Sequence, residues 1–140
     1  MGERPIGILV ALAEEEVVLA HALAGAREHP GTDGPIREGT IDGRAVVLAR
    51  TGIGRVAAAS VATVLCDRFG ARVLLFSGVA GGVAPDLAIG DVVIADRLVD
   101  LDYGRREDAG LLRYRPGSLP LPDVPAPADP GFAADPALLA

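Results

Sequence analysis

Three segments of the sequence combine residue types that could do chemistry. Residues 11–16 read ALAEEE after an apolar run, residues 51–55 read TGIGR, and residues 77–82 read SGVAGG. A carboxylate at the carboxyl end of a strand can act as a general base, provided that water reaches it and its pKa suits the task. Glycine-rich turns let a ligand approach backbone N–H groups closely. Each segment is therefore a candidate ligand-binding or catalytic site.

Each segment also has a purely structural interpretation. Glutamates in the first turn of a helix are favourable because the macrodipole is positive there. The glycines of residues 51–55 and 77–82 are equally compatible with tight turns. Residues 77–82 lack the lysine of a P-loop, and the sequence contains no G-x-S-x-G nucleophile elbow. Taken singly, the segments leave both interpretations open.

The elements that must position these segments alternate between strand and helix. Apolar runs predict strands at 6–12, 73–76 and 91–95, and the dipeptide Asp42-Gly43 predicts a hairpin because both residues tolerate positive φ. The predicted hairpin joins residues 36–41 to residues 44–49. One helix is expected after the glutamates with a stop at Gly25, and a second over 56–69 with a stop at Gly70. The fold class is α/β, with a central mixed sheet flanked by helices.

The composition changes after about residue 101. Residues 102–113 are charged and residues 116–136 hold most of the prolines, which predicts a proline-rich loop over 101–134 following a core over 1–100. Asp135 and Pro136 fit the N-cap and the first position of a helix, so residues 135–140 are expected to begin one.

Composition excludes several classes of function. The 140 residues are 50% hydrophobic but only 4% aromatic, with a net charge of −6, which disfavours nucleic-acid binding because that needs basic surfaces or stacking rings. No apolar run reaches the ~18 residues of a membrane span and no signal peptide is apparent, so we expect a cytoplasmic protein. Cys66 is expected in the core, and His21 and His29 lack partners at metal spacing, so no metal or cofactor is expected.

The order of the three segments is more specific than any one of them. The stretches IGILVALAEEEV, GTIDGRAVVLARTGIGRVAAA and LLFSGVAGGVAPDLAIGDVVIADRLVDLDYG resemble the nucleoside phosphorylase/nucleosidase superfamily over about residues 6–103. The likeness is greatest to the 5′-methylthioadenosine/S-adenosylhomocysteine nucleosidases. It implies a phosphorylase/hydrolase-like three-layer fold and hydrolysis of the N-glycosidic bond of a purine nucleoside.

The resemblance also implies a catalytic residue. These nucleosidases carry A-[LM]-x-x-E after the first strand, and that Glu helps to activate the water that attacks the ribose. The match begins at Ala11 and nominates Glu15, with Glu16 as the fallback if the register slips by one residue. Ala11 would border the water and the ribose.

The two glycine-containing loops match binding loops of the family. The S-G-I-G-K-like loop places Ile53 against the ribose or the 5′ substituent. The T-G-S-A-G-G-like loop places Val79, Ala80 and Gly81 beside the ribose and base, although some members have Ser where this chain has Val79. Residues 102–104 are similar to the region that meets the neighbouring subunit in family dimers, so a homodimer of the full-length form is expected.

The family pattern continues beyond what these 140 residues contain. An M-E-x-E-like segment that holds the ribose hydroxyls and an S-D-like segment whose Asp protonates the purine do not occur. We therefore expect residues 1–140 to be the truncated amino-terminal part of a single phosphorylase-like domain, inactive alone, with an exposed sheet edge. Alternatives are a futalosine hydrolase, a nucleoside phosphorylase, or a non-catalytic half-domain that binds a ligand or partner. Clustered carboxylates at 11–16 would repel phosphate, which favours hydrolysis over phosphorolysis.

Overall fold

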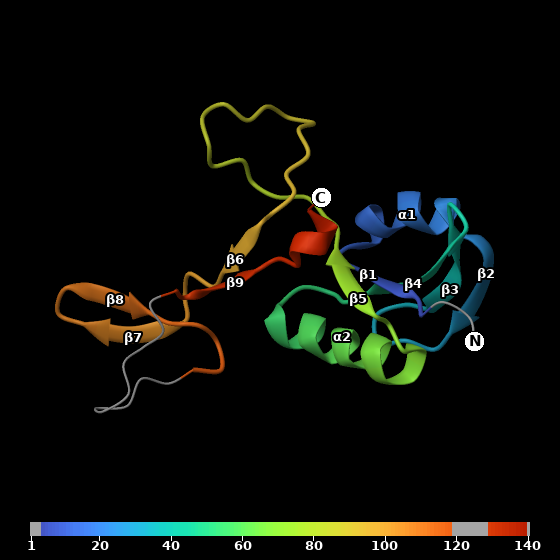
Figure 1. The fold of residues 1–140 in the computed structure, drawn as a ribbon, viewed down its shortest axis with the longest axis horizontal. Helices are drawn as coiled ribbons and strands as arrows, with labels where there is room; N and C mark the ends of the chain where they lie inside the picture. Colours follow the sequence, from blue (N-terminus) through green and yellow to red (C-terminus); the bar gives the residue numbers. More distant parts are fainter. Residues whose placement is uncertain (1–3, 119–128, 140) are drawn as a thin grey trace. The chain divides into compact units, whose positions relative to one another are not determined.

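The computed structural model describes residues 4–118 and 129–139. The chain divides into two compact units, Met1–Gly81 and Gly82–Ala140. Figure 1 shows the first unit as a sheet with helices and the second as pairs of short strands. All the residues nominated for catalysis and binding belong to the first unit.

A five-stranded mixed sheet forms the centre of the first unit, in the order β2-β3-β4-β1-β5. Its strands are β1 (Ile6–Val10), β2 (Ala24–His29), β3 (Ile36–Ile41), β4 (Arg44–Arg50) and β5 (Val73–Phe76). Strand β1 pairs in parallel with β4 and β5, whereas β2, β3 and β4 pair antiparallel. The outer strand β5 leaves Phe76 62% exposed, as expected for a sheet edge.

Helices α1 (Ala13–Ala22) and α2 (Arg55–Phe69) lie on opposite faces of this sheet (Figure 1). Successive side chains of a strand point to opposite faces, so β1 and β4 each contribute to two apolar clusters. The α2 face buries Leu9, Val47, Ala49, Val61 and Leu65, and the α1 face buries Ile8, Val10, Leu23, Val46 and Leu48. The structure confirms the predicted α/β class with its central mixed sheet.

Two turns follow the sequence prediction closely. Asp42 and Gly43 join β3 to β4 with φ of 50° and 75°, values that glycine adopts freely and Asp tolerates. Gly70 ends α2 in the left-handed conformation, with φ of 68°, and its N–H donates to the carbonyl of Cys66. The prediction that Cys66 lies in the core is wrong: the side chain is exposed, because buried Val61 and Leu65 define the inward face of α2.

The first helix ends earlier than predicted. It stops at Ala22, and Gly25, with φ of 64°, lies instead in β2 where the pairing with β3 shifts register. The sequence AGAREH of β2 has no apolar alternation. Its strand forms because β3 offers a free edge, a tertiary effect that overrides local preference.

The second unit contains strands in regions predicted as loop. Strand β6 (Arg97–Val99) pairs antiparallel with β9 (Gly131–Ala133), and β7 (Gly104–Glu107) forms a hairpin with β8 (Gly110–Arg113). The loop prediction over 101–134 is therefore wrong for β7, β8 and β9, whereas β6 lies before that range and residues 119–128 lie outside the described residues. Where the sequence predicts the start of a helix, the structure contains the 3-10 helix Pro136–Leu138, and the Asp135 carboxylate accepts from the N–H of Ala137 at 2.9 Å.

The strand predicted over 91–95 does not form. Val92, Val93 and Ile94 are 88%, 68% and 76% exposed, and residues 91–95 belong to no strand. A strand needs a neighbour that accepts and donates along its length, and within the described ranges no strand pairs with this segment. An apolar sequence alone is therefore not enough to form a strand at residues 91–95.

Candidate active site

The carboxyl ends of three strands meet at one edge of the five-stranded sheet. Beyond the regular pairing, the N–H of Thr51 donates to the carbonyl of Val10 at 2.8 Å, and the N–H of Ser77 donates to that of Leu9 at 2.9 Å. Because β1 is parallel to both β4 and β5, the segments that follow these strands emerge at the same edge. The three candidate segments therefore start from neighbouring positions.

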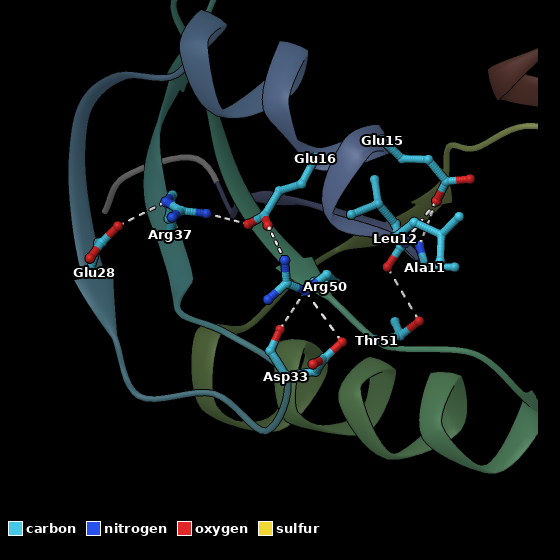
Figure 2. Close-up of polar contacts among 10 residues, drawn as sticks. Ala11, Leu12, Glu15, Glu16, Glu28, Asp33, Arg37, Arg50 and Thr51 are labelled. Carbon is cyan, nitrogen blue, oxygen red and sulfur yellow. Dashed lines mark hydrogen bonds and ion pairs between the residues drawn. The ribbon is translucent and has the colours of Figure 1, made fainter.

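Glu15 is held at this edge by backbone donors. It occupies the third position of α1, from which its Oε2 accepts from the N–H groups of Ala11 and Leu12, both at 2.9 Å (Figure 2). A glutamate at this position commonly reaches back to the residue that precedes the helix. Its Oε1 accepts from the N–H of Val79, also at 2.9 Å. One carboxylate thus joins the start of α1 to the loop after β5.

These donors lower the pKa of Glu15 below its ordinary value of 4.5, with the bond from Val79 contributing most, followed by that from Leu12. Partial desolvation acts against this lowering of the pKa, and the hydrogen bond from Ala11 contributes to the lowering. Hydrogen bonds to the charged form stabilise that form. At neutral pH the side chain is therefore an ionised carboxylate whose two oxygens both accept hydrogen bonds from the backbone.

Gly78 makes room for this carboxylate. A Cβ added at Gly78 would lie 2.8 Å from Oε1 and 3.1 Å from the carboxyl carbon of Glu15. A side chain at this position would force Glu15 to move. The sequence marks residues 77–82 as a close-approach segment but does not reveal that its first glycine faces the glutamate.

Glu16, the fallback candidate, lies on a different side of α1. It is only 6% exposed and is paired with Arg37 of β3 and with Nη1 of Arg50, the latter at 3.3 Å. Figure 2 shows its carboxylate between the two arginines, turned away from Ala11 and Leu12. The geometry therefore favours Glu15 over Glu16 as the group available to a ligand.

The other nominated residues lie on loops that leave the same sheet edge. Ile53 follows β4 and is 83% exposed, while Val79 follows β5 and is also 83% exposed. Ala80 and Gly81 are exposed as well, and Ala11 is half-buried. Hydrogen bonds bring Ala11, Glu15 and Val79 together, whereas the side chain of Ile53 faces solvent.

Sequence reasoning missed the two arginines that pair with Glu16. Arg37 lies opposite Leu48, and Arg50 lies opposite Val10. Leu48 and Val10 both belong to the cluster under α1. Residues that lie opposite each other on neighbouring strands point to the same face of the sheet. The register of the predicted hairpin, extended to β1, could therefore have placed both arginines on the face that α1 covers.

In the described parts of the chain, no group of three or more His, Cys, Asp or Glu side chains is arranged to hold a metal ion. No helix there is long and apolar enough to cross a membrane.

The first unit is a three-layer α/β structure with a carboxylate at the carboxyl ends of parallel strands, where ligands bind in open α/β sheets. Residues 5–140 match the Phosphorylase superfamily, and the chain belongs to that family.

Curated relatives and solved structures are similar to this chain in sequence and in fold. The 5′-methylthioadenosine/S-adenosylhomocysteine nucleosidase of Mycobacterium tuberculosis is 39% identical over 134 residues, covering 96% of this chain and 52% of the relative. The Streptococcus pneumoniae MTA/SAH nucleosidase in complex with 8-aminoadenine superposes with a TM-score of 0.77 at 33% identity, over 96% of this chain and 56% of that one. The futalosine hydrolase of Helicobacter pylori superposes with a TM-score of 0.66 at 32% identity, over 71% of this chain and 43% of that one. The chain spans about half the length of the curated relatives that it matches.

Proposed function

We propose that the protein hydrolyses the N-glycosidic bond of a purine nucleoside of the 5′-methylthioadenosine/S-adenosylhomocysteine type, and that Glu15 activates the attacking water. The observation that carries the proposal is the fixed carboxylate, which accepts three backbone N–H bonds at the ends of β1 and β5. The matched nucleosidases of M. tuberculosis and S. pneumoniae support the substrate class.

In the proposed reaction, the water oxygen forms a bond to the anomeric carbon of the ribose and the bond from that carbon to the purine nitrogen breaks. The bonding electron pair leaves with the base. Glu15 orients the water and accepts its proton as the new bond forms. A carboxylate with a lowered pKa is a weak base, so this step fits an oxocarbenium-like carbon that is already strongly electrophilic.

The loops around Glu15 supply a surface for the nucleoside. We propose that Ala11 borders the water and ribose, that Ile53 contacts the ribose or 5′ substituent, and that Val79 lies beside the ribose. The exposed side chains of Ile53 and Val79 support this role because they offer apolar area at the same sheet edge. Ala80 and Gly81 complete the proposed contact with the base.

We propose that residues 1–140 form the amino-terminal part of a phosphorylase-like domain. The full-length form acts in the cytoplasm as a homodimer. The chain spans 52% of the M. tuberculosis relative, so groups that protonate the base and hold the ribose hydroxyls are assigned to the part of the family pattern outside these residues. We propose that residues 1–140 alone do not turn over substrate.

The test is an assay of base release by the full gene product, with and without inorganic phosphate. Methylthioadenosine, S-adenosylhomocysteine and futalosine are offered separately. The proposal predicts release of adenine from one or both of the first two at a rate independent of phosphate. Release that requires phosphate would identify a phosphorylase instead, and release from futalosine alone would identify a futalosine hydrolase. Either result, or no release, would contradict the proposal.

A further inference from the structure

Helix α1 is anchored at its start by charge. Glu16 is its one buried residue, whereas Val17 and Val18 are 49% and 74% exposed. Leu19 and Ala20 contact the core one turn later and are partly buried. The first turn, which carries Glu15, therefore lacks the apolar contacts that normally fix the rotation of a helix on a sheet.

The anchor extends from Glu16 through two arginines to two further acids. Arg37 of β3 also contacts Glu28 of β2, with 2.9 Å between Nε and Oε1, and Arg50 contacts Asp33 with 3.2 Å between Nε and Oδ2. Figure 2 shows this row of side chains beneath α1. Arg37 and Arg50 are each 21% exposed, so their ion pairs with Glu16 are screened less than surface pairs.

We propose that Glu16 is a positioning residue: through Arg37 and Arg50 it fixes the rotation of α1 and so aims the Glu15 carboxylate at the loop after β5. The kinetic consequence rests on the proposed function of Glu15, but the positioning itself does not.

The geometry makes Glu15 sensitive to rotation of the helix. Neighbouring helical residues point about 100° apart, so Glu15 and Glu16 face different surfaces while sharing one rigid turn. A rotation of about 20° moves an atom at the helix surface, roughly 5 Å from the axis, by about 2 Å. That displacement is enough to break the 2.9 Å bond from Val79 to Glu15.

Removing the charge of Glu16 leaves neither arginine isolated. In a Glu16→Gln variant, Arg37 retains Glu28 and Arg50 retains Asp33. The variant is therefore expected to fold, with α1 held less firmly. Glu14→Gln removes an equal charge from the exposed face of the same turn and is the matched control.

The test is the pKa of the Glu15 side chain, measured by carbon-13 NMR titration of the 140-residue chain. We expect Glu16→Gln to raise this pKa toward the ordinary value, because the bonds from Val79 and Leu12 to the carboxylate weaken. Coulomb's law acting alone predicts the opposite sign, since removal of a neighbouring negative charge lowers a carboxyl pKa. An unchanged or lowered pKa in Glu16→Gln would overturn the inference, as would an equal rise in Glu14→Gln.

A second variant covers the case in which Glu16→Gln fails to fold. Glu16→Asp keeps the charge and withdraws the carboxylate by one methylene group, which stretches both ion pairs. We expect the pKa of Glu15 to rise in this variant as well. A folded Glu16→Asp variant with an unchanged Glu15 pKa would contradict the proposal.

Turnover by the full gene product gives a separate measurement. We expect Glu16→Gln to lower kcat by about tenfold or more with little change in KM, because the misplaced group acts on water rather than on substrate binding. If the parent releases no base while Glu16→Gln still raises the Glu15 pKa, the proposed function fails and the positioning stands. If the parent is active and Glu16→Gln changes neither kcat nor the Glu15 pKa, the positioning fails alone.

Discussion

The backbone N–H of Val79 donates a 2.9 Å hydrogen bond to Oε1 of Glu15, a residue 64 positions earlier in the sequence. This bond links the first turn of α1 to the loop that follows the outer strand β5. It also makes the largest contribution to the lowered pKa of Glu15. The loop therefore holds the carboxylate in place and favours its ionised form.

Gly78→Ala is expected to displace Glu15. The new methyl group would lie 2.8 Å from Oε1, so the carboxylate must move away and weaken its bond to Val79. We expect kcat for base release by the full gene product to fall by about tenfold or more, with a change in unfolding free energy of less than about 1 kcal/mol. Gly82→Ala is the control, because its Cβ would meet Leu87 at an ordinary distance of 3.7 Å. Parental kcat in Gly78→Ala would contradict the expected displacement.

The lowered pKa of Glu15 predicts a pH-dependent contribution to stability. A carboxyl group whose pKa is lowered in the folded state stabilises that state at every pH above its pKa in the unfolded chain, here 4.5. This stabilisation is lost as the pH falls through the pKa of the folded state. Glu15→Gln should therefore have a lower unfolding free energy than the parent at neutral pH, and this difference should shrink as the medium is acidified below pH 4.5. Urea unfolding of both proteins at several pH values measures the difference. A difference that grows on acidification would contradict the prediction.

Leu65→Ala tests the packing of α2 against the five-stranded sheet that carries the candidate site. Leu65 has 0% exposure and packs from α2 against the face that contains Leu9 and Val47. The lost contacts and the remaining cavity should lower the unfolding free energy by about 2–5 kcal/mol. Val56→Ala in the same helix, at a side chain that is 83% exposed, should change it by less than about 0.5 kcal/mol. Equal losses in the two variants would rule out the assigned inward face of α2.

Local sequence signals predicted the elements that depend on local geometry. The β3–β4 hairpin follows from Asp42 and Gly43, and the end of α2 follows from Gly70, because both turns need backbone conformations that few residues accept. The parallel strand β1 follows from an apolar run that is buried on both faces.

Elements that depend on a distant partner were not predictable in the same way. Strand β2 exists because β3 pairs with it. Residues 91–95 join no strand of the described part of the chain, despite a strand-like composition. At the site, the motif nominated Glu15. Its contact with Val79 and the pairing of Glu16 with Arg37 and Arg50 arise only when the sheet brings separate segments together.

The most direct test of the central claim compares Glu15→Gln with Glu14→Gln in the full gene product, using adenine release from methylthioadenosine. Each variant removes one carboxylate from the same helical turn, but only Glu15 accepts from Ala11, Leu12 and Val79. We predict that Glu15→Gln lowers kcat by roughly 10²–10⁴-fold while Glu14→Gln retains parental turnover. Undiminished adenine release by a folded Glu15→Gln variant would contradict the account.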